Sequence, residues 1–122
     1  MNPSLHDILF EHKKYFHPVI DFNPEKDGLL QLDFTGENKE LLNVDFTNTD
    51  QFTHYINQKL TENNCKFGIG GYNEERIFYS RSKLFNDNGE PRTVHLGIDI
   101  WGPVGTTIMA PLSGLVYGFA YN

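Results

Sequence analysis

Apolar residues recur at helical spacing near the start of the chain, and this pattern predicts a helix over residues 4–16. Ser4 can cap its first turn, and Asp7 stands three residues later, as in a capping box. Pro18 ends the helix, because the residue before a proline is disfavoured in the helical conformation. The positions at helical spacing are Leu5, Ile8, Leu9, His12 and Phe16.

A second helical pattern predicts a helix over residues 50–62, with Asn48 or Thr49 as its capping residue. His54 lies off the apolar stripe of this helix, so we expect its side chain to be exposed. The stripe itself consists of Phe52, Tyr55, Ile56 and Leu60.

Two near-copies between these helices alternate apolar and polar residues, as strands do. The sequence LLQLDFT over residues 29–35 is followed by LLNVDFT over residues 41–47. Residues 36–40 between them begin with a glycine and are polar, as hairpin loops commonly are. The pair therefore predicts a β-hairpin over residues 29–47.

Asp33 and Asp45 occupy matching polar positions in the two copies. A pair of carboxylates can act as a catalytic acid and base. The solvated faces of two strands explain the same pattern better, because polar residues normally alternate with buried ones along a half-exposed strand.

Charge and glycine content divide the chain near Cys65. Residues 1–65 carry 5 Lys/Arg and 11 Asp/Glu, whereas residues 66–122 carry 5 of each and 9 of the 11 glycines. We therefore expect an α+β fold, with an acidic helix and hairpin region over 1–65 and a β-rich, antiparallel-sheet domain over 66–122. Its strands are expected at 66–71, 76–80, 106–110 and 115–121, with a turn at 86–89.

Composition narrows the classes of function. The net charge of −6 disfavours nucleic acid as a partner, since phosphate backbones attract basic surfaces. No stretch is apolar and long enough to span a membrane, and no signal peptide is visible after Met1. The single cysteine cannot form an internal disulfide.

The stretch RTVHLGIDIWGPVGT, residues 92–106, carries two metal-ligand side chains, His95 and Asp99. In a straight strand these two would share a face, but their Cα atoms would lie ~13 Å apart, too far for one metal ion. The strand must therefore bend or begin at His95, and Gly97 permits a bend. The opposite face, which we expect to contact a core, consists of Val94, Leu96, Ile98 and Ile100.

The motif R-x-x-H-x-G-x-D begins at Arg92 and is followed by GT, AP and GLV within residues 105–116. This order resembles the lysostaphin-like (LytM-type) zinc metalloendopeptidases. The resemblance implies the duplicated hybrid motif fold, with zinc (Zn²⁺) at the mouth of a groove, and cleavage of peptidoglycan peptides at the bacterial cell envelope. It also implies that His95 and Asp99 are zinc ligands. Arg92 and Trp101 are candidates to border the groove or support the ligands, and Trp101 could instead fill the core.

The sequence departs from this family after His95, because no later histidine is present. The family's His-x-His motif supplies the remaining zinc ligand and a catalytic histidine, so no catalytic residue is assigned within this chain. We expect either a catalytic domain cut short before that motif, or an inactive relative that binds wall peptide or regulates another hydrolase. A third hypothesis is a metal-free sugar-binding β-domain, in which Trp101 and Tyr117 stack on sugar rings.

Overall fold

The computed structural model describes residues 2–76 and 93–121, which form a small mixed α+β structure. They group into two compact units, Met1–Asn23 with Gly105–Asn122 and Pro24–Val104. Each unit combines residues from before and after Cys65, near which the sequence predicts a boundary. The predicted turn at 86–89, Arg92, and all but the first residue of the predicted strand at 76–80 lie outside the described residues.

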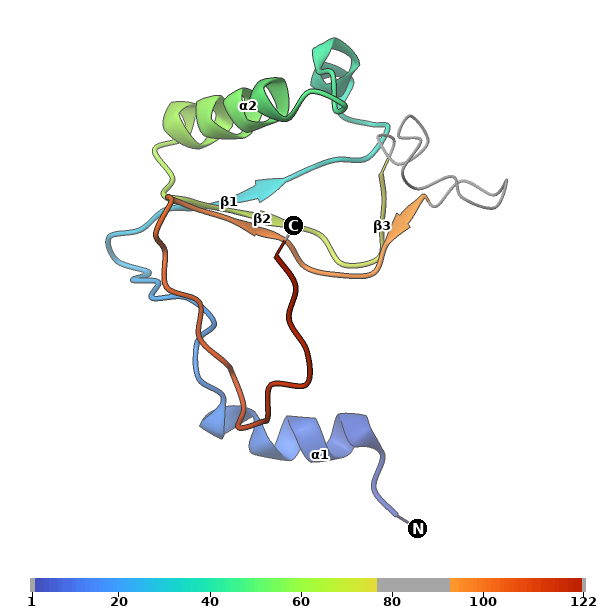
Figure 1. The fold of residues 1–122 in the computed structure, drawn as a ribbon, viewed down its shortest axis with the longest axis vertical. Helices are drawn as coiled ribbons and strands as arrows, with labels where there is room; N and C mark the ends of the chain where they lie inside the picture. The colour runs from blue at the N-terminus through green and yellow to red at the C-terminus, as the bar shows by residue number, and fades with distance from the viewer. Residues whose placement is uncertain (1, 77–92, 122) are drawn as a thin grey trace. The chain divides into compact units, whose positions relative to one another are not determined.

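The larger unit, Pro24–Val104, contains a sheet whose described strands are β1 (Leu29–Leu32), β2 (Phe67–Gly70) and β5 (Ile100–Trp101), in the order β1-β2-β5 (Figure 1). β1 runs parallel to β2, and β5 runs antiparallel to β2. The helix α2 (Thr49–Glu62) connects β1 to β2 and packs against the sheet (Figure 1). The predicted helix at 50–62 and strand at 66–71 are therefore confirmed.

The core of the larger unit lies between α2 and this sheet. Phe34 is completely buried, and its ring centroid lies 5.8 Å from that of Phe52 and 5.1 Å from that of Trp101. The apolar stripe of α2 thus faces the core, as its spacing predicts. The buried core cluster consists of Leu32, Phe34, Leu41, Ile56 and Leu60.

The predicted hairpin over residues 29–47 is wrong. The first copy forms β1, but β1 pairs with β2, and the second copy overlaps the short 3₁₀ helix η2 (Lys39–Asn43). The side chain of Asn38 accepts a hydrogen bond from the backbone N–H of Glu40 and so caps η2. This helix turns Leu41 into the core at zero exposure, a burial that outweighs the strand-like pattern.

The Asp-Phe-Thr ends of both copies nevertheless form the same local turn. The side chain of Asp33 accepts a hydrogen bond from the backbone N–H of Thr35 at 2.8 Å. Asp45 accepts the corresponding bond from Thr47 at 2.9 Å. Both aspartates are exposed, so turn formation accounts for the matching carboxylates.

A second sheet pairs β3 (Glu74–Glu75) with β4 (Val94–His95) in antiparallel orientation. Glu74 lies opposite His95 in this pair. β4 and β5 both come from the strand-like stretch around His95, yet they belong to different sheets. The chain between them must therefore change direction.

The smaller unit, Met1–Asn23 with Gly105–Asn122, begins with α1 (Leu5–His12) and η1 (Lys13–Tyr15). Ser4 and Asp7 form the predicted capping box. The predicted strand at 106–110 is reduced to a single bridge between Ile20 and Ile108, and 115–121 forms no strand. Within the described residues these segments have no adjacent strand with which to form a ladder.

Among residues 2–76 and 93–121, no helix has the length and apolar character needed to cross a membrane.

Candidate metal centre

The chain bends between His95 and Asp99, as a shared metal ion requires. His95 ends β4, and Asp99 directly precedes β5. The bend brings the Nε2 atom of His95 within 3.2 Å of the Oδ2 atom of Asp99. Gly97 lies inside the bend, at the position where the sequence predicts one. The two predicted metal ligands therefore lie side by side.

The prediction that the alternate, apolar residues of this stretch contact a core is wrong. The face that carries His95 and Asp99 is the half-buried one, because it is turned toward a buried arginine, Arg76. Burying a charged group without polar partners costs more free energy than leaving an aliphatic side chain exposed to water. The apolar residues left exposed are Val94, Leu96, Ile98 and Ile100.

Backbone hydrogen bonds fix both ends of the bend. The N–H of Gly70 donates to the carbonyl of Asp99 at 2.9 Å, which ties Asp99 to the end of β2. The N–H of Arg76 donates to the carbonyl of Thr93 at 2.7 Å, which ties the start of β4 to the residue after β3. Each of the two sheets therefore positions one of the two candidate ligands.

Arg76, which the sequence pattern did not single out, lies at the centre of the site. Its side chain is only 2% exposed. Its Nε atom donates to Glu74 at 2.9 Å, its Nη1 atom donates to Oδ2 of Asp99 at 2.5 Å, and its guanidinium lies 5.2 Å from the ring centroid of Phe34. The signal in the sequence is weak: Glu74 and Arg76 are two residues apart, as side chains on one strand face are.

A cavity of about 460 Å³ opens beside the two candidate ligands. Trp101 lines this cavity and also packs on Phe34, so its ring both borders the site and contacts the core. Tyr117, the partner of Trp101 in the sugar-stacking hypothesis, belongs to the smaller unit and is fully exposed. The cavity is lined by Phe52, Arg76, His95, Ile98, Asp99, Ile100 and Trp101.

The donor pair lies close to the separation of two ligands in a tetrahedral zinc site. Ligand atoms about 2.0–2.2 Å from zinc at tetrahedral angles lie about 3.3–3.6 Å from each other. The separation of the His95 and Asp99 donor atoms is 3.2 Å. A catalytic zinc usually has three protein ligands, and in the described part of the chain no three His, Cys, Asp or Glu side chains gather to hold a metal ion. The other histidines, all exposed, are His6, His12, His17 and His54.

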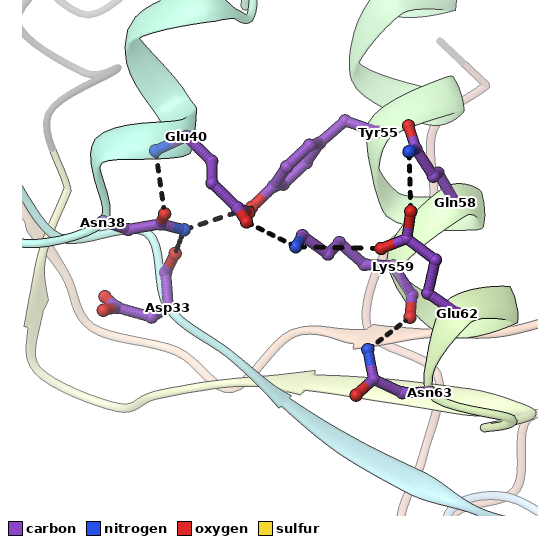
Figure 2. A network of polar contacts seen from close by, with 8 residues as sticks. All are labelled: Asp33, Asn38, Glu40, Tyr55, Gln58, Lys59, Glu62 and Asn63. Atoms are coloured by element: carbon purple, nitrogen blue, oxygen red, sulfur yellow. Dashed lines mark hydrogen bonds and ion pairs between the residues drawn. The ribbon is translucent and has the colours of Figure 1, made fainter.

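A separate polar network joins η2 to α2 (Figure 2). Glu40 accepts hydrogen bonds from Lys59 at 2.6 Å and from the hydroxyl of Tyr55 at 3.2 Å. The bond from Lys59 holds the pKa of Glu40 below its ordinary value, and burial raises the pKa of Tyr55. Asn38 donates to the Tyr55 hydroxyl at 3.1 Å, which links the cap of η2 to the same network. The hydrogen bonds of this network connect the two helices η2 and α2, and this structural role accounts for them.

Comparison with models of known protein families, with curated proteins and with solved structures finds no match to this chain. The resemblance to lysostaphin-like peptidases therefore rests on the ordered motif that begins at Arg92. Membership of that family stays a prediction.

Proposed function

We propose that this chain provides two metal ligands of a zinc-dependent endopeptidase that cleaves peptides of peptidoglycan. The observation that carries the proposal is the approach of His95 Nε2 and Asp99 Oδ2 to 3.2 Å beside a cavity. These residues also stand at the metal positions of the motif that the sequence resembles. Under this proposal the β-rich part of the chain is a metallopeptidase-like sheet, and the protein acts at the bacterial cell envelope.

His95 and Asp99 would hold the zinc ion, which supplies Lewis acidity toward a scissile carbonyl and acidifies water. The contribution of this chain would be placement, because His95 at the end of β4 and Asp99 directly before β5 both line one cavity. Ile98 and Trp101 give that cavity apolar walls, which favour contact with the apolar part of a peptide. The proposal requires a third protein ligand in the active form.

The second candidate function is that of an inactive relative, which binds wall peptide or regulates another hydrolase. One observation favours it: the described residues contain no third metal donor beside the pair. A cavity with an aromatic wall can hold a peptide without cleaving it.

Calorimetric titration of zinc into chelator-treated protein tests the metal site. We expect binding of one zinc ion per chain. His95→Ala and Asp99→Asn should weaken binding by more than about tenfold, since even changes around the ligands weaken metal binding by about 10–100-fold. The control His54→Ala removes an exposed histidine of α2 and should leave the affinity unchanged. Equal affinity in His95→Ala and the wild type would overturn the metal site.

Incubation with purified peptidoglycan separates the two candidate functions. Release of new amino groups that requires both zinc and His95 supports the endopeptidase. Sedimentation of the protein with peptidoglycan, without release of amino groups and without a zinc requirement, supports the inactive relative.

A further inference from the structure

We propose that Arg76 and Glu74 form a positioning pair that holds the carboxylate of Asp99 in place for a divalent cation. This inference rests on the metal site proposed above and adds to it two residues that lie outside the motif. Arg76 donates to Asp99 and to Glu74 at once, so the guanidinium bridges the two carboxylates. We therefore regard these residues as a single unit with His95.

One oxygen of Asp99 meets both neighbours. Its Oδ2 atom accepts the hydrogen bond from Arg76 Nη1 and lies 3.2 Å from His95 Nε2. A carboxylate offers about four lone-pair sites on its two oxygens, so one hydrogen bond leaves room for a metal ion. The Asp99 side chain is 37% exposed, so solvent reaches it while Arg76 stays bound, whereas the Nε2 atom of His95 is buried.

Arg76 is held too firmly to act as a mobile side chain. Its guanidinium lies against the Phe34 ring and is only 2% exposed, and its Nε atom is bound to Glu74. The backbone of β2 also approaches it closely: a Cβ atom on Gly70 would lie 2.6 Å from Nη2 of Arg76. The planar fork of an arginine then fixes where its partner carboxylate can lie. The orientation of Asp99 is set before any cation binds.

Glu74 explains how a cation can bind next to an arginine. Alone, the positive charge of Arg76 would repel a second cation at Asp99. Glu74, two residues before Arg76 in the chain, balances that charge, and its side chain is only 10% exposed. Together Glu74, Arg76 and Asp99 carry one net negative formal charge, which attracts a divalent cation. Glu74 thus neutralises the charge of Arg76, so that the negative charge of Asp99 stays available to a cation.

The competing role for Arg76 is that of a blocker, which occupies Asp99 and must leave before a metal ion binds. The two roles predict opposite signs. A positioning pair predicts that weakening Arg76 or Glu74 lowers zinc affinity. A blocker predicts that weakening Arg76 raises it.

Zinc titration of Glu74→Gln, Arg76→Lys and Glu75→Gln decides between these roles. We expect about 10–100-fold weaker binding in the first two variants, the range for residues that orient metal ligands. Glu75 is the exposed neighbour on the same strand, so Glu75→Gln should bind zinc like the wild type. Thermal unfolding of the chelator-treated variants shows whether they fold. If Arg76→Lys does not fold, the zinc affinity of Glu74→Gln decides between the two roles.

Cobalt absorption adds a readout that a purely structural role would not change. With Co²⁺ in place of zinc, displacement of Asp99 should shift the visible bands in Glu74→Gln, whereas simple destabilisation leaves the bands of the folded protein unshifted. Wild-type zinc affinity and unshifted bands in Glu74→Gln, or stronger binding in Arg76→Lys, would overturn this inference alone. Failure of the wild type to bind zinc would overturn the proposed metal site and this inference together.

Discussion

The backbone of Gly97 lies so close to His95 that a Cβ atom on Gly97 would stand 3.0 Å from Nε2 of the imidazole. Carbon and nitrogen atoms that are not bonded prefer about 3.5 Å or more. A larger residue at position 97 must therefore displace the ring that faces Asp99. Gly97 therefore permits the close approach of the His95 and Asp99 side chains as well as the turn of the backbone.

Gly97→Ala should lower zinc affinity by about tenfold, because the added methyl group moves the imidazole away from Asp99. Calorimetric titration measures this change. Stability should change by no more than about 1 kcal/mol, since the imidazole is partly exposed and can shift. The matched control is Gly114→Ala, where an added Cβ meets nothing within 4 Å. Wild-type zinc affinity in Gly97→Ala would contradict the prediction.

Phe34→Ala should lower the free energy of unfolding by about 3–5 kcal/mol, because it leaves a cavity in the core. Phe34 is completely buried and contacts Trp101, the only tryptophan of the chain. Urea unfolding followed by tryptophan fluorescence measures the loss. Leu42→Ala, at a side chain 62% exposed, should change stability by less than about 0.5 kcal/mol. Similar effects of the two substitutions would contradict the core described above.

Asn48→Ala should destabilise the larger unit by about 1 kcal/mol through loss of the cap of α2. The Asn48 side chain accepts hydrogen bonds from the backbone N–H groups of Asp50 and Gln51, both at 3.1 Å. Asn48→Asp keeps an acceptor there and adds a negative charge that suits a helix N-terminus, so its stability should stay near the wild type. Thermal unfolding followed by circular dichroism compares the three proteins, and an equal loss in both variants would argue against the cap.

The bond between Glu40 and Lys59 should make stability depend on pH at both extremes. The folded pKa of Glu40 is depressed below its ordinary value of 4.5, mainly by the hydrogen bond from Lys59. Its contribution is therefore present above pH 4.5 and is lost as pH falls through the folded pKa. The pKa of Lys59 is raised above its ordinary value of 10.5 by the bond to Glu40. That contribution is present below pH 10.5 and is lost as pH rises through the folded pKa.

A double-mutant cycle of Glu40→Gln and Lys59→Met, followed by urea unfolding at neutral and acid pH, measures this interaction. Both side chains are partly exposed, so the coupling at neutral pH should be about 0.2–1 kcal/mol. It should disappear well below pH 4.5. A coupling that is equal at both pH values would contradict the pKa shift of Glu40.

Local signals in the sequence predicted the features whose partners are close in the chain. Ser4 and Asp7, three residues apart, form the expected box, and Asn48 caps the helix that follows it. The need for a bend between His95 and Asp99 followed from the reach of a strand alone. In each case the chain between the partners is too short to allow many alternative arrangements.

Distant partners could not be predicted in this way. The alternation over residues 29–35 suits a strand of a hairpin and a strand of a parallel pair equally. The hairpin does not form because η2 buries Leu41 in the core. Arg76 meets Asp99 across 23 residues, and nothing in either local sequence specifies that contact. Its burial then reversed the expected inner and outer faces of the stretch around His95.

Because β2 lies between β1 and β5 in the sheet, both strand pairs of the larger unit join segments that are distant in the chain, and we expect them to form after the local helix. The segment that contains η2 and α2 separates β1 from β2, and the segment that contains β3 and β4 separates β2 from β5. The capped α2 helix forms from local contacts, whereas each strand pair requires closure of a long loop, which is slower. The bond from Gly70 to Asp99 forms only when β5 reaches β2. We therefore expect the contact between β5 and β2, and with it the bond from Gly70 to Asp99, to form late in folding.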